Sequence, residues 1–225
     1  MKVHVLVEGS SERAFIDRWA PRAFPGHQFV VHPHQGKGTL PRDLAATPDP
    51  RHRGLLDLLP ATLRAYSATT AMVADGVLVI VDLDDDERAK VEARLVEVAE
   101  TALPLRVVIR LAIEELEAFY LGDLKALKAA FPEANMVLAT EYVPDSIVGT
   151  AELFGQIIDD DGLRKVSWAE QMGARLTTVG ARSRSPSFKA LHASIRELVK
   201  VSAKSKTPRK KHWKSRHSSL RKANS

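Results

Sequence analysis

The chain has 225 residues, a length that suits one domain of good size or one domain with an appendage. Hydrophobic residues make up 44% of it and charged residues 27%, which is ordinary for a globular protein and argues against wholesale disorder. There are no cysteines, which excludes disulfides and thiolate metal sites, so a metal would be held by oxygen or imidazole ligands.

The net charge of +5 is unevenly placed along the chain. Residues 200–225 contain ten Lys or Arg and no acidic residue, which leaves 23 basic against 28 acidic residues elsewhere, a net charge of −5. This distribution predicts an acidic folded body with a basic arm. The N-terminal sequence turns polar too soon for a signal peptide, and no apolar run approaches the roughly 20 residues that cross a bilayer, so we expect a cytoplasmic protein.

The first half of the chain predicts strands that alternate with helices. Residues 2–7 form a short apolar strand, and Ser10 and Ser11 are candidate N-caps for the helix that follows. Residues 28–32 predict a second strand, which leads into a glycine-flanked loop around Lys37. Residues 54–66 predict a helix that Pro60 kinks or breaks.

The strongest predicted strand covers residues 76–83. A helix over 87–101 follows, whose inward side chains are expected to be Val91, Leu95, Val96 and Val98. Residues 105–112 predict another buried strand, and 114–121 begin a helix. The alternation predicts an α/β fold, a parallel sheet with helices on both faces.

Beyond residue 124 the pattern is helical. Helices are expected over 124–131, 151–157, 163–172 and 186–200, the last with Pro186 in its first turn. From about residue 201 apolar periodicity ends, and we expect a segment that is disordered or folds on binding. The predicted organisation is an α/β core over 1–125, a helical extension packed on it over 126–200, and a basic flexible tail over 201–225.

Acidic residues follow several of the predicted strands. Glu8 follows the first, and Asp82 and Asp84 follow the strongest. Parallel strands end at one edge of a sheet and lie about 4.8 Å apart, so these carboxylates are expected to share one or two hard cations. Asp82 and Asp84 would face the same way in an extended segment, and Mg²⁺ prefers oxygen ligands. Helix capping is the alternative reading for the acids just after the strand, namely Asp85, Asp86 and Glu87.

Short motifs occur in a fixed order along residues 2–198. They are Val7-Glu8-Gly9-Ser10-Ser11-Glu12, Gly36-Lys37-Gly38, Asp82-Leu83-Asp84, Glu115-Leu116-Glu117-Ala118-Phe119 and Ser185-Pro186-Ser187-Phe188-Lys189. The glutamate after the first strand and the later Asp-x-Asp resemble the Toprim fold. The whole series resembles a bacterial Toprim-like family of unknown function that is related to the OLD-type (overcoming lysogenization defect) nucleases.

This resemblance implies metal-dependent cleavage of phosphodiester bonds in DNA or RNA. It implies that Glu8 is a metal ligand or a general acid or base, and that Asp82 and Asp84 hold Mg²⁺ or Mn²⁺. Glu12, Glu115 or Glu117 would complete a second metal site, and two metals activate the attacking water and stabilise the leaving oxygen. Lys37 and Lys189 are candidates for the scissile phosphate. The candidate site residues, metal ligands and phosphate-binding lysines together, are Glu8, Glu12, Lys37, Asp82, Asp84, Glu115, Glu117 and Lys189.

The resemblance also implies a role in phage defence beside a partner ATPase, and an oligomer is compatible with the sequence. Topoisomerases of this fold use a tyrosine nucleophile, but the tyrosines here lie in no recognisable strand-passage context. The loop around Lys37 lacks the upstream glycine of a Walker motif, and a plain surface loop remains its alternative. His32 and His34 alternate at a strand end and are read as a solvated edge rather than as metal ligands.

The basic tail combines cations with Trp213, a composition that favours nucleic-acid binding over a solubilising terminus. Two functions compete with the nuclease hypothesis. One is a non-catalytic module that binds nucleic acid or a partner through the tail. The other is a phosphotransfer enzyme of another doubly wound class, because such folds also carry acids at strand ends.

Overall fold

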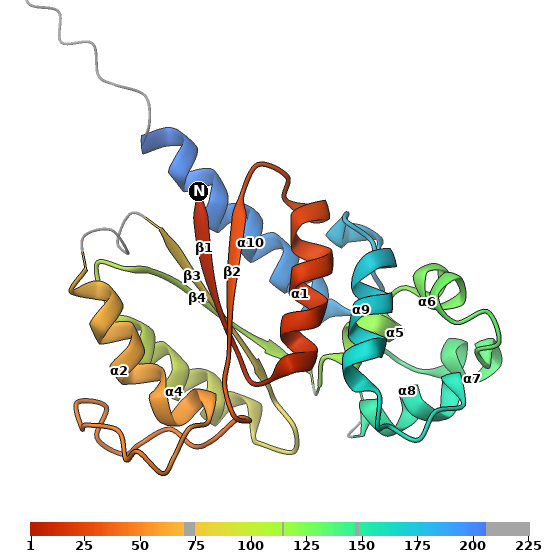
Figure 1. Ribbon diagram of the computed structural model, residues 1–225, viewed down its shortest axis with the longest axis horizontal. Helices are drawn as coiled ribbons and strands as arrows, with labels where there is room; N and C mark the ends of the chain where they lie inside the picture. The colour runs from red at the N-terminus through yellow and green to blue at the C-terminus, as the bar shows by residue number, and fades with distance from the viewer. Residues whose placement is uncertain (70–74, 114, 147–148, 206–225) are drawn as a thin grey trace, which may run out of the picture.

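The computed structural model describes residues 1–69, 75–113, 115–146 and 149–205. These residues form an α/β fold around one four-stranded parallel sheet with the strand order β2-β1-β3-β4 (Figure 1). The strands are β1 (Lys2–Val7), β2 (Gln28–Pro33), β3 (Gly76–Asp82) and β4 (Arg106–Ala112). The predicted fold class is therefore confirmed, with each strand within one or two residues of its predicted range.

The two central strands are mainly apolar and largely buried, because helices cover both sides of the sheet. Val3, Val5 and Val7 of β1 lie in a core cluster with residues of α1 (Ser10–Ala23) and α10 (Pro186–Ser205). The alternate residue Leu6 lies in a second cluster, together with apolar residues of α2 (Leu55–Ser67) and α4 (Arg88–Glu100). Successive side chains of a strand point to opposite faces, so α1 and α10 cover one face and α2 and α4 the other.

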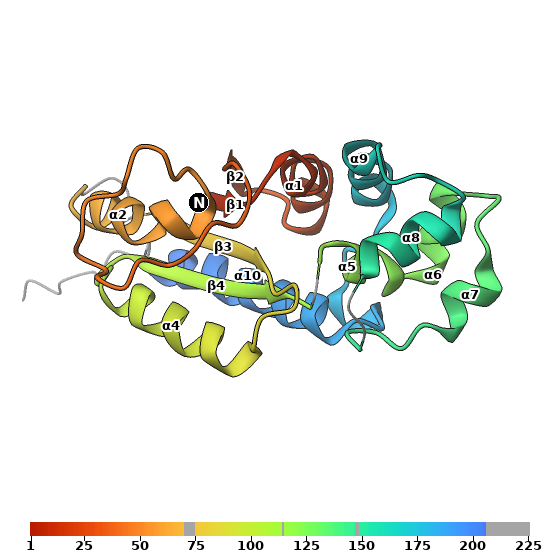
Figure 2. The same cartoon turned by 90° about the horizontal axis from the view of Figure 1, so that it is seen from below.

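The remaining helices gather beyond α1, at one end of the molecule (Figures 1 and 2). They pack against α1 through α9, where the backbones come close: a Cβ added to Gly173 would lie 2.8 Å from the carbonyl oxygen of Phe15. Trp19 Nε1 and Arg22 Nη1 donate hydrogen bonds to Thr177 O and Gly173 O, at 3.0 and 2.8 Å. These elements are α5 (Glu117–Leu121), α6 (Leu124–Ala130), α7 (Met136–Glu141), α8 (Thr150–Ile158), α9 (Lys165–Arg175) and the 3₁₀ helix η1 (Gly180–Arg182).

One core cluster runs from the sheet into this helical group, and it includes Val5, Phe119, Phe154 and Trp168. The core is therefore continuous across residue 125. The division of the chain into an α/β core and a helical extension at that residue stays a prediction. Helix α7 was not predicted, since its short sequence has no amphipathic repeat. In the parts of the chain that the structure describes, no helix is long and apolar enough to cross a membrane.

Several local predictions are wrong. The N-cap of α1 is Gly9, and Ser11 Oγ donates instead to Glu12 Oε1 at 2.9 Å. A break at Pro60 does not occur, since helix α2 continues through this residue, where the buried leucines around it pack in one cluster with residues of the sheet. Val96 was expected to face inward, but 57% of it is exposed.

Strand β4 was expected to be buried, but its first five residues are only half-buried because it lies at the edge of the sheet. At the C-terminus, α10 continues to Ser205, past the predicted end of the helix at residue 200. The tail was expected to cover 201–225, but its first five residues belong to α10, and residues 206–225 lie outside the described residues.

Candidate metal centre

Glu8 follows β1 directly, and its carboxylate reaches across to the end of β3. Its Oε1 accepts a hydrogen bond from the backbone N–H of Asp82 at 2.8 Å. The strand register explains this reach, because Leu6 of β1 pairs with Val79 of β3 and Glu8 therefore lies level with Val81. The prediction that Glu8 and Asp82 meet at one edge of the sheet is confirmed.

The environment of Glu8 favours its protonated form. Burial raises the pKa of the Glu8 carboxyl from 4.5 to about 7. The hydrogen bond from Asp82 and the positive charge of Lys37 lower this pKa, whereas the negative charges of Asp84 and Glu12 raise it. A carboxyl group with a pKa near neutrality can both hold and release a proton at physiological pH.

Asp82, the last residue of β3, lies at the centre of the acidic group. Its Oδ1 is buried and has no hydrogen-bond partner among the described residues. Burial raises the pKa of the Asp82 carboxyl well above its usual value, and the charges of Glu8, Glu12 and Glu117 raise it further. An ionised carboxylate is costly in such a place unless a proton or a cation neutralises it.

Two helices add buried glutamates to this group. Glu12 comes from the first turn of α1 and is 6% exposed, while Glu117 begins α5 and is 3% exposed. Burial raises the pKa of the Glu117 carboxyl from 4.5 to about 7, although the positive charge of Lys165 opposes this rise. Sheet ends and helix starts thus bring acids from separate segments together.

Tyr120 lies on the inner side of the group. Its hydroxyl is buried without a hydrogen-bond partner among the described residues, and its ring centroid is 5.6 Å from that of Phe15. It stands one helical turn after Glu117, as Phe15 stands one turn after Glu12. Burial raises the pKa of the Tyr120 hydroxyl, and the charges of Glu117 and Glu12 add to this effect. Sequence reasoning missed Tyr120, since it considered tyrosines only as nucleophiles.

Asp84 does not continue the line of the strand. Its φ of 52° is left-handed, so the extended geometry expected to aim Asp82 and Asp84 the same way does not hold. Instead, Asp84 Oδ2 pairs with Lys37 Nζ at 2.9 Å. Lys37 also pairs with Asp86 Oδ2 at 2.6 Å and donates to Leu83 O at 3.0 Å. Lys37 therefore fixes the loop after β3 and neutralises its outer acids.

The glycine-flanked loop delivers Lys37 to this position by packing tightly on the start of α2. Gly38 has a φ of 67°, and a Cβ added to it would lie 2.3 Å from Asp57 Oδ2. Asp57 in turn accepts hydrogen bonds from the backbone N–H groups of Gly54 and Thr39, both at 3.0 Å. The loop is thus held by specific contacts with α2, which the plain surface-loop alternative did not anticipate.

Glu115 is engaged elsewhere. Its Oε2 accepts hydrogen bonds from Ala151 N at 2.8 Å and Thr150 Oγ1 at 3.3 Å, at the start of α8. Lys165 Nζ from α9 lies 3.6 Å from Glu115 Oε1, and the charge of Glu117 also acts on Lys165. Sequence reasoning missed Lys165, because no local pattern in α9 signals that it faces the distant glutamates.

Lys189 lies exposed on α10, and no hydrogen bond or ion pair joins its side chain to the acids among the described residues. The motif around it caps α10. Ser185 Oγ accepts from Phe188 N at 3.1 Å and donates to Asp145 Oδ1 at 2.9 Å, while Asp145 Oδ2 accepts from Ser187 N at 2.6 Å. The observed contacts of this motif are structural ones.

The two candidate histidines, His32 and His34, make different contacts. His32 Nε2 lies 3.0 Å from His4 Nδ1 with the rings stacked, whereas His34 Nδ1 lies 2.9 Å from Val7 O. The tail with Trp213 lies outside the described residues.

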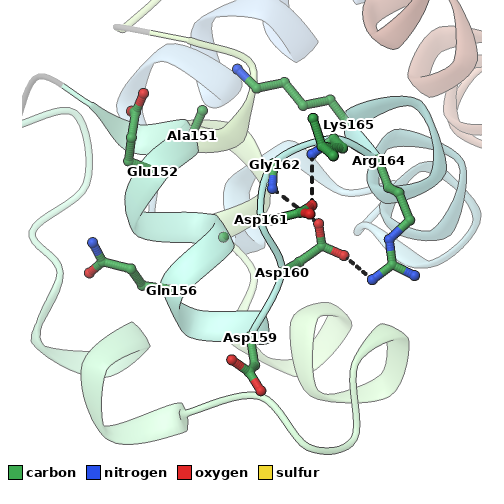
Figure 3. Close-up of a pocket in the computed structure, with 11 residues that line it drawn as sticks. Ala151, Glu152, Gln156, Asp159, Asp160, Asp161, Gly162, Arg164 and Lys165 are labelled. Atoms are coloured by element: carbon green, nitrogen blue, oxygen red, sulfur yellow. Dashed lines mark hydrogen bonds and ion pairs between the residues drawn. The ribbon is translucent and has the colours of Figure 1, made fainter.

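A cavity of about 990 Å³ lies between α8 and the loop that leads into α9, and Asp82 is not among the residues that line it (Figure 3). Two of its lining residues, Ala151 and Lys165, contact Glu115. Figure 3 shows Arg164 paired with Asp160, so this cation is already neutralised within the cavity wall. Acidic side chains outnumber basic ones in the lining, which disfavours a phosphate there.

The donor set suits a hard divalent cation. Carboxylate oxygens are the ligands that Mg²⁺ and Mn²⁺ prefer, and the partnerless Oδ1 of Asp82 is an available donor. Within the described ranges, however, no three His, Cys, Asp or Glu side chains are arranged to hold a metal as they stand. The acids are gathered but not preassembled, so binding a cation requires them to move toward it.

Comparison with known proteins identifies a family but no activity. The family model described as "Domain of unknown function (DUF4276)" matches residues 7–196, and the chain belongs to that family. No curated protein matches the chain, and no solved structure does.

Proposed function

We propose that this DUF4276 member is a metal-dependent nuclease that cleaves phosphodiester bonds of DNA or RNA. In this proposal Mg²⁺ or Mn²⁺ is held by Asp82 with Glu8, Glu12, Asp84 and Glu117. Glu115 is left out because its carboxylate caps α8.

The observation that carries the proposal is the buried, partnerless carboxylate oxygen of Asp82. It lies within an acidic group in which the charges of Glu8, Glu12 and Glu117 add to the rise in the pKa of Asp82 that burial causes. Burying several carboxyls together costs stability, and a fold retains such a cost where a bound cation offsets it. Composition excludes thiolate metal sites, because the chain has no cysteine, and the residues of this group offer only carboxylate oxygens.

A divalent cation bound here supplies a polarised phosphoryl oxygen and an activated water. Residues of the chain transfer the proton and bind the phosphate. Glu8, with a pKa of about 7, takes up or releases a proton at its carboxyl group. Lys37 can exchange its outer partners for a phosphate, since Asp84 and Asp86 are about half exposed at their side chains. Lys165 pairs with Glu115 at 3.6 Å, and its positive charge opposes the negative charge of Glu117.

The resemblance to Toprim and OLD-type nucleases supports the choice of nucleic acid as substrate. It alone also supports a role as the effector of a phage-defence system with a partner ATPase. The basic residues after 200 add a counter-charge to an otherwise acidic body, which a polyanionic substrate requires.

The test compares Glu8→Gln and Asp82→Asn with wild type in plasmid nicking and RNA cleavage, with Mg²⁺ or Mn²⁺. Both variants are expected to abolish cleavage and the rise in Tm on adding Mn²⁺. Glu141→Gln on α7, an exposed position, serves as the matched control and keeps both. Wild-type cleavage by a Glu8→Gln, Asp82→Asn double variant would refute the assignment.

A non-catalytic binding module is the second candidate, favoured by the absence of a preassembled metal site in the described residues. It predicts nucleic-acid binding that survives Glu8→Gln and Asp82→Asn and is lost on deleting residues 201–225. Release of phosphate from small phosphoesters without action on polymers would point to a phosphotransfer enzyme instead.

A further inference from the structure

The outer edge of β4 carries backbone groups that no other strand of the described residues pairs with. Ala112 O accepts from Leu83 N at 3.0 Å, so the carbonyl of Ala112 faces β3. Backbone direction alternates along a strand, and the N–H and C=O groups of Val107, Ile109 and Leu111 therefore point outward. Figure 2 shows β4 along this side of the sheet, next to α4.

The two charged side chains of β4, Arg106 and Arg110, are hydrogen-bonded to other parts of the fold and so do not protect this edge. Edge strands are usually protected by charges, prolines or bulges. Arg110 Nε instead donates to Ser194 Oγ on α10 at 2.7 Å, and Arg106 Nη2 lies 3.4 Å from Asp75 O. Arg110 Nη1 also donates to Ile109 O at 2.8 Å, which supplies one outward carbonyl with a donor from its own strand.

A mainly apolar groove follows the same edge, and the charged residues Arg88, Glu92, Arg110 and Asp145 also contribute to its lining. Its volume is about 530 Å³, and α4 and the start of α10 form its two walls. Val96 of α4 lines it and is 57% exposed, beside Ala99, Val107 and Ile109. An exposed apolar side chain such as Val96 is typical of a surface that another surface covers.

The sequence of β4 is complementary to itself in one antiparallel register. With Ile109 opposite Ile109, Val107 meets Leu111 on the α4 side of the sheet. On the α10 side Val108 meets Arg110, so no arginine faces another. A register centred on Val108 would instead place Arg106 opposite Arg110, which like charges disfavour.

We infer that the β4 edge is the interface of a symmetric homodimer, in which β4 pairs antiparallel with β4 of a second copy. The pairing continues each four-stranded sheet into the other and gives the outward backbone groups their partners. The two-fold axis passes between the Ile109 residues of the two copies, and Val96 lines the same groove as Ile109. Such a self-complementary patch is the form that a two-fold interface requires.

The first test measures mass against concentration for the full chain, by sedimentation equilibrium. The expected species has twice the 24.8 kDa of one chain. Val96→Glu brings two like charges together near the axis and is expected to weaken dimerisation by at least about 10-fold. Val137→Glu on α7 is the matched control, because Val137 is an exposed helical valine (71%) far from β4 in sequence, and it is expected to leave dimerisation unchanged.

The second test uses the absence of cysteine from the chain. Val96→Cys is expected to give a covalent dimer with a short bismaleimide crosslinker, whereas Val137→Cys gives none. A chain that stays monomeric up to about 100 μM, well above typical dimer dissociation constants, overturns the inference. So does a dimer that Val96→Glu leaves intact, or one that crosslinks equally through both cysteines. A monomer whose β4 edge binds a strand of another protein would also overturn it.

Discussion

Glu117→Gln tests how much stability the protein loses by burying an ionised carboxylate in the acidic group. Glu117 is 3% exposed, and burial raises its pKa from 4.5 to about 7. A glutamine has nearly the shape of the protonated glutamate but never ionises. The substitution leaves Lys165 beside Glu115, 3.6 Å away, so that no cation loses its last partner.

The magnitude follows from proton linkage. A carboxyl whose pKa is higher in the folded state binds its proton more tightly there, so stability is highest at low pH and falls as pH rises from 4.5 through about 7. At about 1.4 kcal/mol for each factor of ten in the binding constant, the loss above pH 7 is about 3 kcal/mol. Glu117→Gln should recover it at pH 8, a rise in Tm of about 6–12 °C for a chain of this size.

The assay is thermal and urea unfolding of the metal-free protein at pH 5 and pH 8. Glu117→Gln should be more stable than wild type at pH 8, and most of the gain should disappear at pH 5. Glu141→Gln, at an exposed position of α7, should show no such pH-dependent gain. Added Mn²⁺ should raise the Tm of wild type more than that of Glu117→Gln. Equal stability of variant and wild type at pH 8, or an equal gain at both pH values, would refute the reasoning.

Three further predictions concern the surroundings of the site. Tyr120→Phe should raise the free energy of urea unfolding by about 1 kcal/mol, because it removes a buried hydroxyl without a described partner; a loss of stability would contradict this. Ser185→Ala should lower the free energy of unfolding by about 1 kcal/mol, because the α10 cap is lost. The control Ser167→Ala, at an exposed site of α9, should leave it unchanged, and equal effects of the two variants would argue against capping. Lys37→Met should change stability by less than about 1 kcal/mol for each ion pair lost, because the side chains of its partners Asp84 and Asp86 are about half exposed. It should also move the acidic limb of the cleavage pH profile upward, since the Lys37 charge lowers the pKa of Glu8; an unmoved limb would count against Glu8 as the titrating group.

The local sequence was enough to predict the strands and the edge at which the acids meet. Short runs rich in valine and leucine identified β1 and β3, because a strand covered on both faces buries mainly apolar side chains. Parallel pairing then brings Glu8 and Asp82 to one edge, whatever the loops do. These predictions held since each depends on residues adjacent in sequence and on one general rule of sheet geometry.

The directions of side chains beyond the strand ends depended on tertiary packing. Asp84 turns to Lys37 because the chain becomes left-handed there, and Glu115 turns to the start of α8, a helix more than thirty residues later. Neither partner is recognisable from the acids' own neighbours in the sequence. Lys165 meets the glutamates only because α9 packs on α1 and α5 lies nearby.

By itself, then, the sequence determined the α/β class, the four parallel strands and the shared position of Glu8 and Asp82. The tertiary structure decided which acids are buried together, which are neutralised by lysines, and that β4 is the edge strand of the sheet formed by the described residues. The physical reason is that hydrophobic periodicity is a local property of the chain. Burial, charge pairing and strand order arise only when distant segments come into contact, and these contacts set the pKa values at the site.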